Sequence, residues 1–143
     1  MKRSGFTRVS DCALIEFPKV PDPRGNLTFI EGVRHVPFEI KRLFYLHDVP
    51  AGASRGGHAH RTLEQVLICM SGGLEVRLDD GAEQRTMRLS RPWTGLYIPA
   101  MIWDTETHFA PGTVCLVLAS DYYNEADYLR DYAEFLAAKS ASR

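Results

Sequence analysis

Two histidines and a glutamate lie close together in the tract that runs from Gly52 to Glu64. They are His58, His60 and Glu64, at a spacing of two residues and then four. Side chains alternate between the two faces of an extended strand, so all three can point to one side. Inside a small β-barrel, this face would form either an acid/base site, with neutral imidazole as the base near pH 7, or a metal site.

Short strands separated by turn residues account for most of the sequence. The run from Leu63 to Met70 is nearly all apolar and predicts a strand buried on both faces, whereas Leu74 to Asp79 alternates and predicts a half-buried strand. Gly-rich turns flank the second of these. Further strands are expected at 14–17, 25–31, 42–46, 85–89, 95–98, 102–107 and 114–120. This pattern favours an all-β sandwich or barrel over βαβ units.

The C-terminal region has a different periodicity, which predicts a helix over residues 125–138 docked on the outside of the barrel. The residues that form its apolar stripe are Tyr128, Leu129, Tyr132, Phe135 and Leu136. No repeat, low-complexity tract or linker divides the chain, so we expect one domain over residues 1–143.

Composition limits the classes of function. The net charge of −1 argues against nucleic-acid binding or attraction to a membrane surface, and no apolar run is long enough to span a bilayer. An anionic ligand would need a local cluster of arginines. Cys12, Cys69 and Cys115 are scattered, which is typical of buried thiols in a reducing compartment. With no apolar segment behind the basic N-terminal residues to form a signal peptide, we expect a cytoplasmic enzyme or binding protein.

The histidine tract fits the first sequence motif of the cupins, Gly-x5-His-x-His-x3-Glu, from Gly52 to Glu64. The second motif would be Gly95 to Asp104, where Asp104 occupies the place of a usual fourth metal ligand, histidine. This resemblance implies an all-β double-stranded β-helix, or jelly-roll barrel. The absent histidine weakens the metal interpretation, although two histidines and a carboxylate form a known facial triad for iron.

A closer resemblance extends over about 110 residues. Its segments, in order, are Asp22-Pro23-Arg24-Gly25-Asn26-Leu27, Pro37 to Tyr45, Arg55-Gly56-Gly57-His58-Ala59-His60, Leu63-Glu64-Gln65, Gly95-Leu96-Tyr97, Leu118 to Tyr123 and Asp127 to Tyr132. Together they resemble the nucleotide-sugar 3,4-ketoisomerases, cupins that act on dTDP-4-keto-6-deoxyglucose. The resemblance implies a metal-independent isomerase without a cofactor, and a homodimer that exchanges N-terminal strands. It also implies a role in deoxysugar biosynthesis.

Moving a ketone from C4 to C3 requires removal of the C3 proton, passage through an enediol(ate) and delivery of a proton to C4. By resemblance, His58 is the C3 base and His60 is its partner. Tyr45 is a candidate hydrogen-bond donor or proton shuttle near C4. Glu64 is then expected to be a residue of the pocket wall.

The remaining candidates would bind substrate. Arg24, Arg42 and Arg55 lie in the matching segments and could hold a diphosphate, although for Arg42 a surface ion pair is an equal alternative. Trp103 could stack on the base or the sugar, and Asp104 stands where relatives commonly carry a cationic residue. In the family that the chain resembles, the position of Asp104 is expected to bear on whether the product has the galacto or the gluco configuration at C4. By resemblance, Arg24 favours the galacto product, but Asp104 is not the cationic residue expected to accompany it.

Two other classes stay open at this point. A metal-dependent cupin oxygenase would use His58, His60 and Glu64 as ligands and lose activity with chelators. A non-catalytic cupin would bind a nucleotide sugar without turnover, and replacing His58 by Asn would leave no activity to lose.

Overall fold

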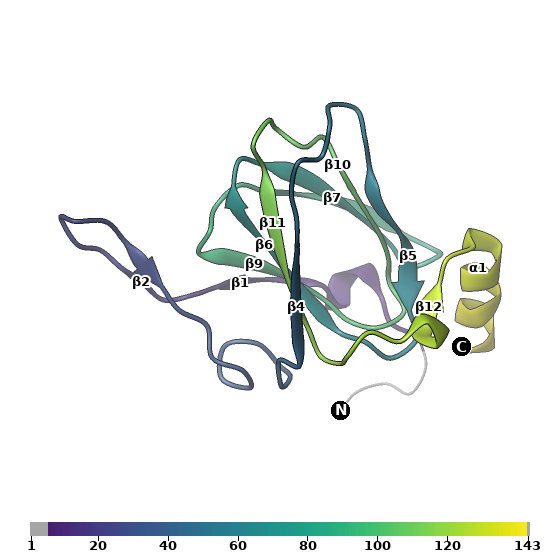
Figure 1. The fold of residues 1–143 in the computed structure, drawn as a ribbon. Helices are drawn as coiled ribbons and strands as arrows, with labels where there is room; N and C mark the ends of the chain where they lie inside the picture. Colours follow the sequence, from purple (N-terminus) through teal and green to yellow (C-terminus); the bar gives the residue numbers. More distant parts are fainter. Residues whose placement is uncertain (1–5, 143) are drawn as a thin grey trace.

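The computed structural model describes residues 6–142, and nearly all of its regular structure is β (Figure 1). The elements are η1 Val9–Asp11, β1 Ala13–Glu16, β2 Lys19–Val20, β3 Leu27–Thr28, β4 Arg42–Leu46, β5 Arg55–His60, β6 Gln65–Ser71, β7 Leu74–Asp79, β8 Gln84–Leu89, β9 Thr94–Ile98, β10 Trp103–Thr107, β11 Val114–Ala119, η2 Glu125–Asp127, β12 Tyr128–Leu129 and α1 Tyr132–Ala141. One five-stranded sheet has the order β1-β9-β6-β11-β4 and the other β12-β5-β10-β7-β8. This confirms the predicted all-β barrel with a short C-terminal helix.

The main apolar core lies between the two sheets. Leu67 and Leu96 contribute to it from the first sheet, and Leu74 and Leu78 from the second, all of them almost fully buried. Each such side chain contributes on the order of 1.5–3 kcal/mol relative to an exposed position. The core fills one part of the space between the sheets and leaves the rest for polar side chains.

Strand β6 is buried on both faces, as its nearly continuous apolar run predicts. Leu67 and Cys69 point into the core between the sheets. Val66 and Ile68 point the other way and pack under the N-terminal segment, against Phe17. The outer face of the first sheet is therefore covered by the chain that precedes β4.

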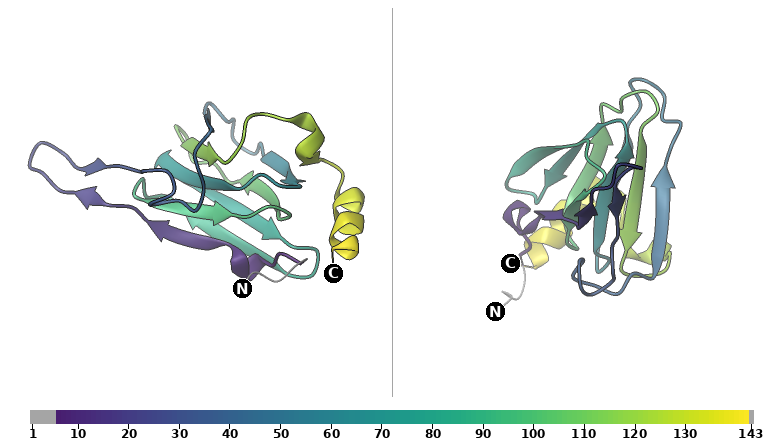
Figure 2. Two further views of the ribbon diagram at one scale, coloured as in Figure 1. Left: turned by 90° about the horizontal axis from the view of Figure 1, so that it is seen from below. Right: turned by 90° about the vertical axis from the view of Figure 1, so that its left-hand side faces the viewer.

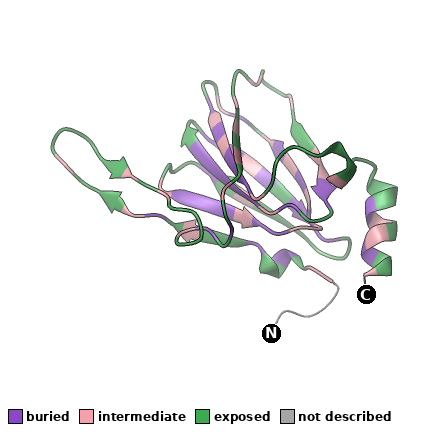
Figure 3. Cartoon of the chain, turned by 60° about the horizontal axis from the view of Figure 1, so that its bottom comes forward, coloured by how far each residue is buried: buried purple, intermediate pink, exposed green. Residues whose placement is uncertain are grey.

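A hairpin formed by β2 and β3 projects from the body of the molecule (Figure 2). Its side chains are largely exposed, among them those of Val20, Leu27 and Phe29 (Figure 3). Isolated apolar side chains are common on surfaces, and these three lie together on one projecting arm.

The C-terminal helix begins later than its sequence pattern predicts. Tyr128 and Leu129, assigned to the helix over 125–138, instead form β12, which pairs Tyr128 with His60 on β5. Asp131 then caps α1, where its side chain accepts a hydrogen bond from the Glu134 backbone N–H at 3.1 Å. The pairing with β5 satisfies backbone groups that a helix would have used, so the helix starts only after it. No helix in the described part of the chain is long and apolar enough to cross a membrane.

Candidate active site

Strand β5 supplies the two histidines and is bent by a bulge next to them. Asp104 on β10 pairs with His58, but Thr105 pairs with Gly56, so Gly57 is an extra residue on β5. Gly56 has φ +79°, and a Cβ there would lie 2.9 Å from the Asp104 carbonyl oxygen. Only glycine fits this position, and the bulge brings Arg55, Gly56 and His58 to the same cavity.

The rings of His58 and His60 lie side by side, with Tyr128 packed against both. The centroids of the two imidazoles are 5.1 Å apart, and the Tyr128 ring is 5.1 Å from His58 and 4.4 Å from His60. His58 is half-buried and His60 is buried. Neither Nδ1 atom has a hydrogen-bond partner among the described residues. Each ring therefore has one buried nitrogen atom without a hydrogen bond from the described residues.

Burial keeps both imidazoles neutral at neutral pH. It lowers the pKa of His60 to about 4, with a further contribution from the adjacent His58 ring. It also lowers the pKa of His58, and the positive charge of Arg130 acts in the same direction. A neutral imidazole can accept a proton, so the electrostatics suit general-base chemistry.

Asp127 lies behind His60 and connects it to the loop that follows β5. Its Oδ2 is 3.6 Å from His60 Nδ1. The same carboxylate accepts hydrogen bonds from the Thr62 N–H at 2.9 Å, the Thr62 hydroxyl at 2.8 Å and the Leu63 N–H at 3.1 Å. Asp127 therefore holds the segment between β5 and β6 in place beside the histidine pair.

Two carboxyl groups, those of Asp104 and Glu106, are buried on the inner face of β10. The Gln65 side-chain amide donates a hydrogen bond to Asp104 Oδ2 at 2.9 Å. Asp104 Oδ1 and Glu106 Oε2 have no hydrogen-bond partner among the described residues. Burial raises the pKa of Asp104 to about 7. It also raises the pKa of Glu106, and the nearby Asp104 charge raises it further.

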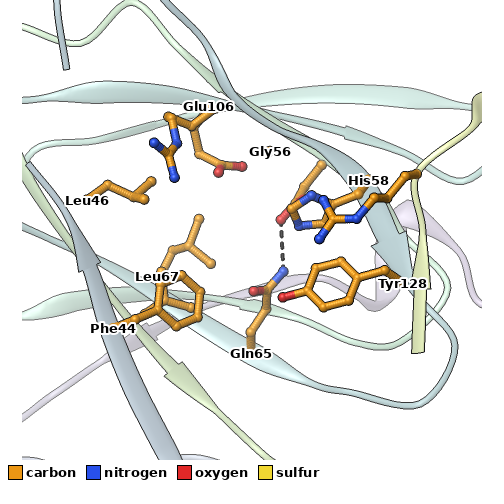
Figure 4. Close-up of a pocket in the computed structure, with 12 residues that line it drawn as sticks. Phe44, Leu46, Gly56, His58, Gln65, Leu67, Glu106 and Tyr128 are labelled. Atoms are coloured by element: carbon orange, nitrogen blue, oxygen red, sulfur yellow. Dashed lines mark hydrogen bonds between the residues drawn. The ribbon is translucent and has the colours of Figure 1, made fainter. Parts of the chain in front are cut away.

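These groups surround one cavity between the sheets, of about 180 Å³ (Figure 4). Figure 4 shows His58 and Tyr128 on one side of it, Glu106 on another, and Phe44 and Leu67 opposite the histidine. Arg55 and Arg130 also line it. The cavity thus combines two arginines, two buried carboxyls and an imidazole with an apolar wall, which suits a polar, anionic ligand with a nonpolar part.

The structure brings His58, Arg55 and Asp104 to this cavity, as the sequence predicts, and places His60 directly beside it. Arg42 lies nearby, with its guanidinium 5.1 Å from the Phe44 ring. Its Nε and Nη2 are buried and have no hydrogen-bond partner among the described residues.

Arg24 is not near the cavity of its own chain. It lies in the turn between β2 and β3, where its side chain is 90% exposed and paired with Asp22 at 2.9 Å. The projecting hairpin carries it away from the histidine pair (Figure 2). Within one chain, therefore, Arg24 cannot contact a ligand bound in the cavity.

Tyr45 and Trp103 point away from the cavity, in contrast to the sequence-based expectation. Along β4, Phe44 and Leu46 face the cavity, whereas Tyr45 lies on the other face and is 57% exposed. Trp103 packs under α1, with its ring centroid 5.2 Å from Tyr132 and 5.6 Å from Phe135. Strand alternation explains both cases, because the neighbouring residue takes the inward position.

Glu64 also departs from its expected position on the face of the two histidines. It accepts a hydrogen bond from the Tyr97 hydroxyl at 2.5 Å, and Tyr97 packs with the apolar cluster on the outer face of the first sheet. The chain turns between β5 and β6, so that Gln65 rather than Glu64 faces the cavity. A metal site with Glu64 as third ligand therefore does not fit. Within residues 6–142, no group of three His, Cys, Asp or Glu side chains is arranged to hold a metal ion.

Several residues of the site were missed by sequence reasoning, namely Gln65, Glu106, Asp127, Tyr128 and Arg130. Glu106 could have been found, because it is two residues from Asp104 on a predicted strand and so shares its face. The sequence pattern places Tyr128 in the apolar stripe of the predicted helix, so it gives no indication that the ring packs against the histidines.

A two-sheet β-barrel with a histidine pair at an internal polar cavity defines the protein as a cupin. The family model FdtA (WxcM-like, C-terminal) matches residues 10–140. The chain therefore belongs to this family, which includes sugar-nucleotide 3,4-ketoisomerases.

Three relatives illustrate the similarity. The TDP-4-oxo-6-deoxy-alpha-D-glucose-3,4-oxoisomerase of Aneurinibacillus thermoaerophilus is 44% identical over 122 residues, which are 85% of this chain and 88% of that protein. A variant of the 3,4-ketoisomerase QdtA from Thermoanaerobacterium thermosaccharolyticum, in complex with TDP-4-keto-6-deoxyglucose, matches with a TM-score of 0.90 and 41% identity, over 93% of this chain and 97% of that one. The TDP-quinovose 3,4-ketoisomerase WlaRB from Campylobacter jejuni matches with a TM-score of 0.86 and 43% identity, over 90% and 99%.

Proposed function

We propose that this protein is a 3,4-ketoisomerase of TDP-4-keto-6-deoxyglucose that acts in deoxysugar biosynthesis. The observation that carries the proposal is the pair of neutral histidines at the cavity, within a fold and sequence shared with such enzymes. A base that is neutral at physiological pH is what removal of a proton next to a ketone requires. The reaction is internal to the substrate, so it consumes no other reactant.

In the proposed mechanism, His58 removes the proton from C3, which the adjacent C4 ketone acidifies. The electron pair of the C3–H bond forms a C3–C4 double bond, and the C4 oxygen gains a proton to give an enediol. Loss of the proton on the C3 oxygen, with protonation of C4, then produces the 3-ketone. We assign His60 and the adjacent Tyr128 to the part of the site that orients the sugar and His58, because both rings pack against His58.

Three arginines are suited to the TDP diphosphate. Arg55 and Arg130 line the cavity, and the buried donors of Arg42 lie beside it. Guanidinium groups donate paired hydrogen bonds that match phosphate oxygens. Arg130 is held by Glu125, with its Nε 2.8 Å from Glu125 Oε1, and its guanidinium lies 4.2 Å from the centre of the Tyr128 ring. We expect a phosphate to compete with Glu125 for this guanidinium.

We further propose a homodimer in which the N-terminal strands are exchanged. The β2–β3 arm exposes apolar side chains, and an apolar groove of about 400 Å³ lies between it and the first sheet. The groove includes Ile30, Met70, Trp93 and Leu116. A second copy that covered this surface would bury it, and its arm could carry Arg24 to the neighbouring cavity.

Subunit mixing tests the dimer. Two variants, Arg24→Ala and His58→Asn, are each expected to be weakly active or inactive. In a mixed dimer with exchanged arms, one cavity would combine the intact Arg24 of one chain with the intact His58 of the other. Co-expression should therefore restore activity, up to about half that of the wild type if mixed dimers predominate. A monomer in light scattering, or no restoration in purified mixed dimers, would contradict the proposal.

NMR spectroscopy of the sugar tests the function itself. Incubation with TDP-4-keto-6-deoxyglucose in the presence of a chelator should give the TDP-3-keto-6-deoxyhexose. The metal-dependent alternative predicts loss of turnover under this condition, and a non-catalytic binding protein would leave the substrate unchanged. The three unpaired, buried cysteines accord with the cytoplasmic location that we propose for this reaction.

A further inference from the structure

The buried carboxyl group of Asp104 has no role in the histidine mechanism, yet it lies in the centre of the site. Asp104 is directly opposite His58 in the pairing of β10 with β5, and only 2% of it is exposed. It lines the same cavity as His58. A buried carboxyl group with an unpaired oxygen is costly, so its presence in a ligand cavity calls for a function.

The hydrogen bonds of Asp104 distinguish its two oxygens. Oδ2 accepts a hydrogen bond from the Gln65 amide, which is the dashed line at Gln65 in Figure 4. Oδ1 has no partner among the described residues. A protonated carboxyl group would therefore carry its proton on Oδ1, the buried oxygen that lacks a hydrogen bond within the described residues. Burial favours the protonated state of Asp104, and the charge of an ionised Asp104 would in turn raise the pKa of the adjacent Glu106.

We propose that Asp104, as a neutral carboxylic acid, is a further catalytic residue that shuttles the proton between the two reacting oxygens of the sugar. This inference rests on the proposed function. While His58 takes the C3 proton, Asp104 gives its proton to the C4 oxygen, and the electron pair of the carbonyl π bond forms the new O–H bond. The carboxylate then takes the proton from the C3 oxygen while the protonated His58 gives its proton to C4. The C3 ketone forms and the acid is restored, so protons and electrons balance.

Proton transfer by Asp104 makes the rate depend on pH, because charged groups on the surrounding elements influence its protonation. The titratable or charged side chains that face it or act on it are Glu106 on the same strand, His58 and Arg55 on β5, Cys115 on β11, Arg130 after β12 and Cys12 before β1. The acid is active only while protonated, so its raised pKa of about 7 predicts that activity falls as pH rises through that value. The lowered pKa of His58 places the loss of the base at acidic pH, so the profile is bell-shaped.

The experiment compares the wild type with Asp104→Asn and with Asp79→Asn as a matched control. Asp79 is also a buried carboxylate, but it lies away from the cavity and accepts a hydrogen bond from the Tyr132 hydroxyl at 2.8 Å. Two rates are measured across pH: formation of the 3-keto product, and incorporation of solvent deuterium at C3 of the recovered substrate. Circular dichroism and TDP binding verify that each variant is folded, and Asp104→Ala replaces Asp104→Asn if the latter does not fold.

We expect Asp104→Asn to lower product formation by about a hundredfold and to remove the decline at alkaline pH. Deuterium incorporation at C3 should fall less, since His58 is intact and the amide can still donate a hydrogen bond to the C4 oxygen. Asp79→Asn should retain the wild-type profile. Activity of Asp104→Asn within about threefold of the wild type, with an unchanged pH profile, would overturn the inference. If the wild type itself forms no product and exchanges no hydrogen, the proposed function fails instead.

Discussion

Replacing Asp104 by Asn should stabilise the protein at alkaline pH. The carboxyl group is buried in the cavity wall, and within residues 6–142 the Gln65 amide is the one side chain that donates a hydrogen bond to it. An asparagine is nearly the same size, and its oxygen can accept the same hydrogen bond. The substitution therefore removes the cost of ionising a buried acid while it preserves the packing.

The magnitude follows from the pKa of Asp104, which burial raises from 3.8 to about 7. Because the folded state prefers the protonated acid, its contribution to stability is complete below about pH 4 and is lost as pH rises through about 7. Each pH unit of difference is worth about 1.4 kcal/mol, so the wild type loses on the order of 4 kcal/mol by about pH 8. This is a large part of the 5–15 kcal/mol typical of a small domain.

Urea unfolding, followed by tryptophan fluorescence, gives the free energies for both proteins. The advantage of the asparagine variant should be small near pH 4 and grow to on the order of 3–4 kcal/mol near pH 8. The depressed pKa of His60 destabilises both proteins alike as pH falls below about 6.5, so it cancels in the comparison. A difference between the two proteins that is constant with pH would show that burial does not raise the pKa of Asp104.

Three further substitutions test how the site is built. Gly56→Ala places a methyl group against the Asp104 carbonyl at a positive φ, so we expect a loss of about 1–3 kcal/mol in urea unfolding together with reduced turnover. Trp103→Ala removes packing against Phe135; it should lower stability by about 2–4 kcal/mol, yet leave kcat per folded molecule within about twofold. Asp127→Ala frees three donors in the loop after β5, and it should cost about 2–4 kcal/mol and raise hydrogen exchange in that loop.

Much of the fold follows from the sequence because strand alternation and turn residues are local signals. Strands β4 and β7 have the predicted bounds, 42–46 and 74–79. The predicted start of the helix was wrong, because Tyr128 and Leu129 fit both an apolar helix stripe and a short strand. Pairing with β5, a contact distant in sequence, decided between the two.

The residues of the site could likewise be predicted only where a local pattern determines their position. The histidine spacing placed His58 and His60 together, because one strand carries both. The face of an isolated strand cannot be assigned from alternation alone, so Tyr45 was expected at the cavity that Phe44 lines instead. Glu64 was expected on the histidine face, but the turn before β6 reverses the chain there. The position of Arg24 relative to the cavity depends on the path of the projecting arm, which no local pattern reveals.

The role proposed for His58 is removal of the C3 proton of the sugar. Its most direct test is the incorporation of solvent deuterium during incubation with TDP-4-keto-6-deoxyglucose, at C3 of the recovered substrate and C4 of the product. The matched control for His58→Asn is His108→Asn, which changes an exposed histidine outside the cavity. We predict deuterium at both carbons for the wild type and the control, and a loss of about a thousandfold or more in His58→Asn. Undiminished exchange at C3 in a folded His58→Asn variant would show that His58 is not the base.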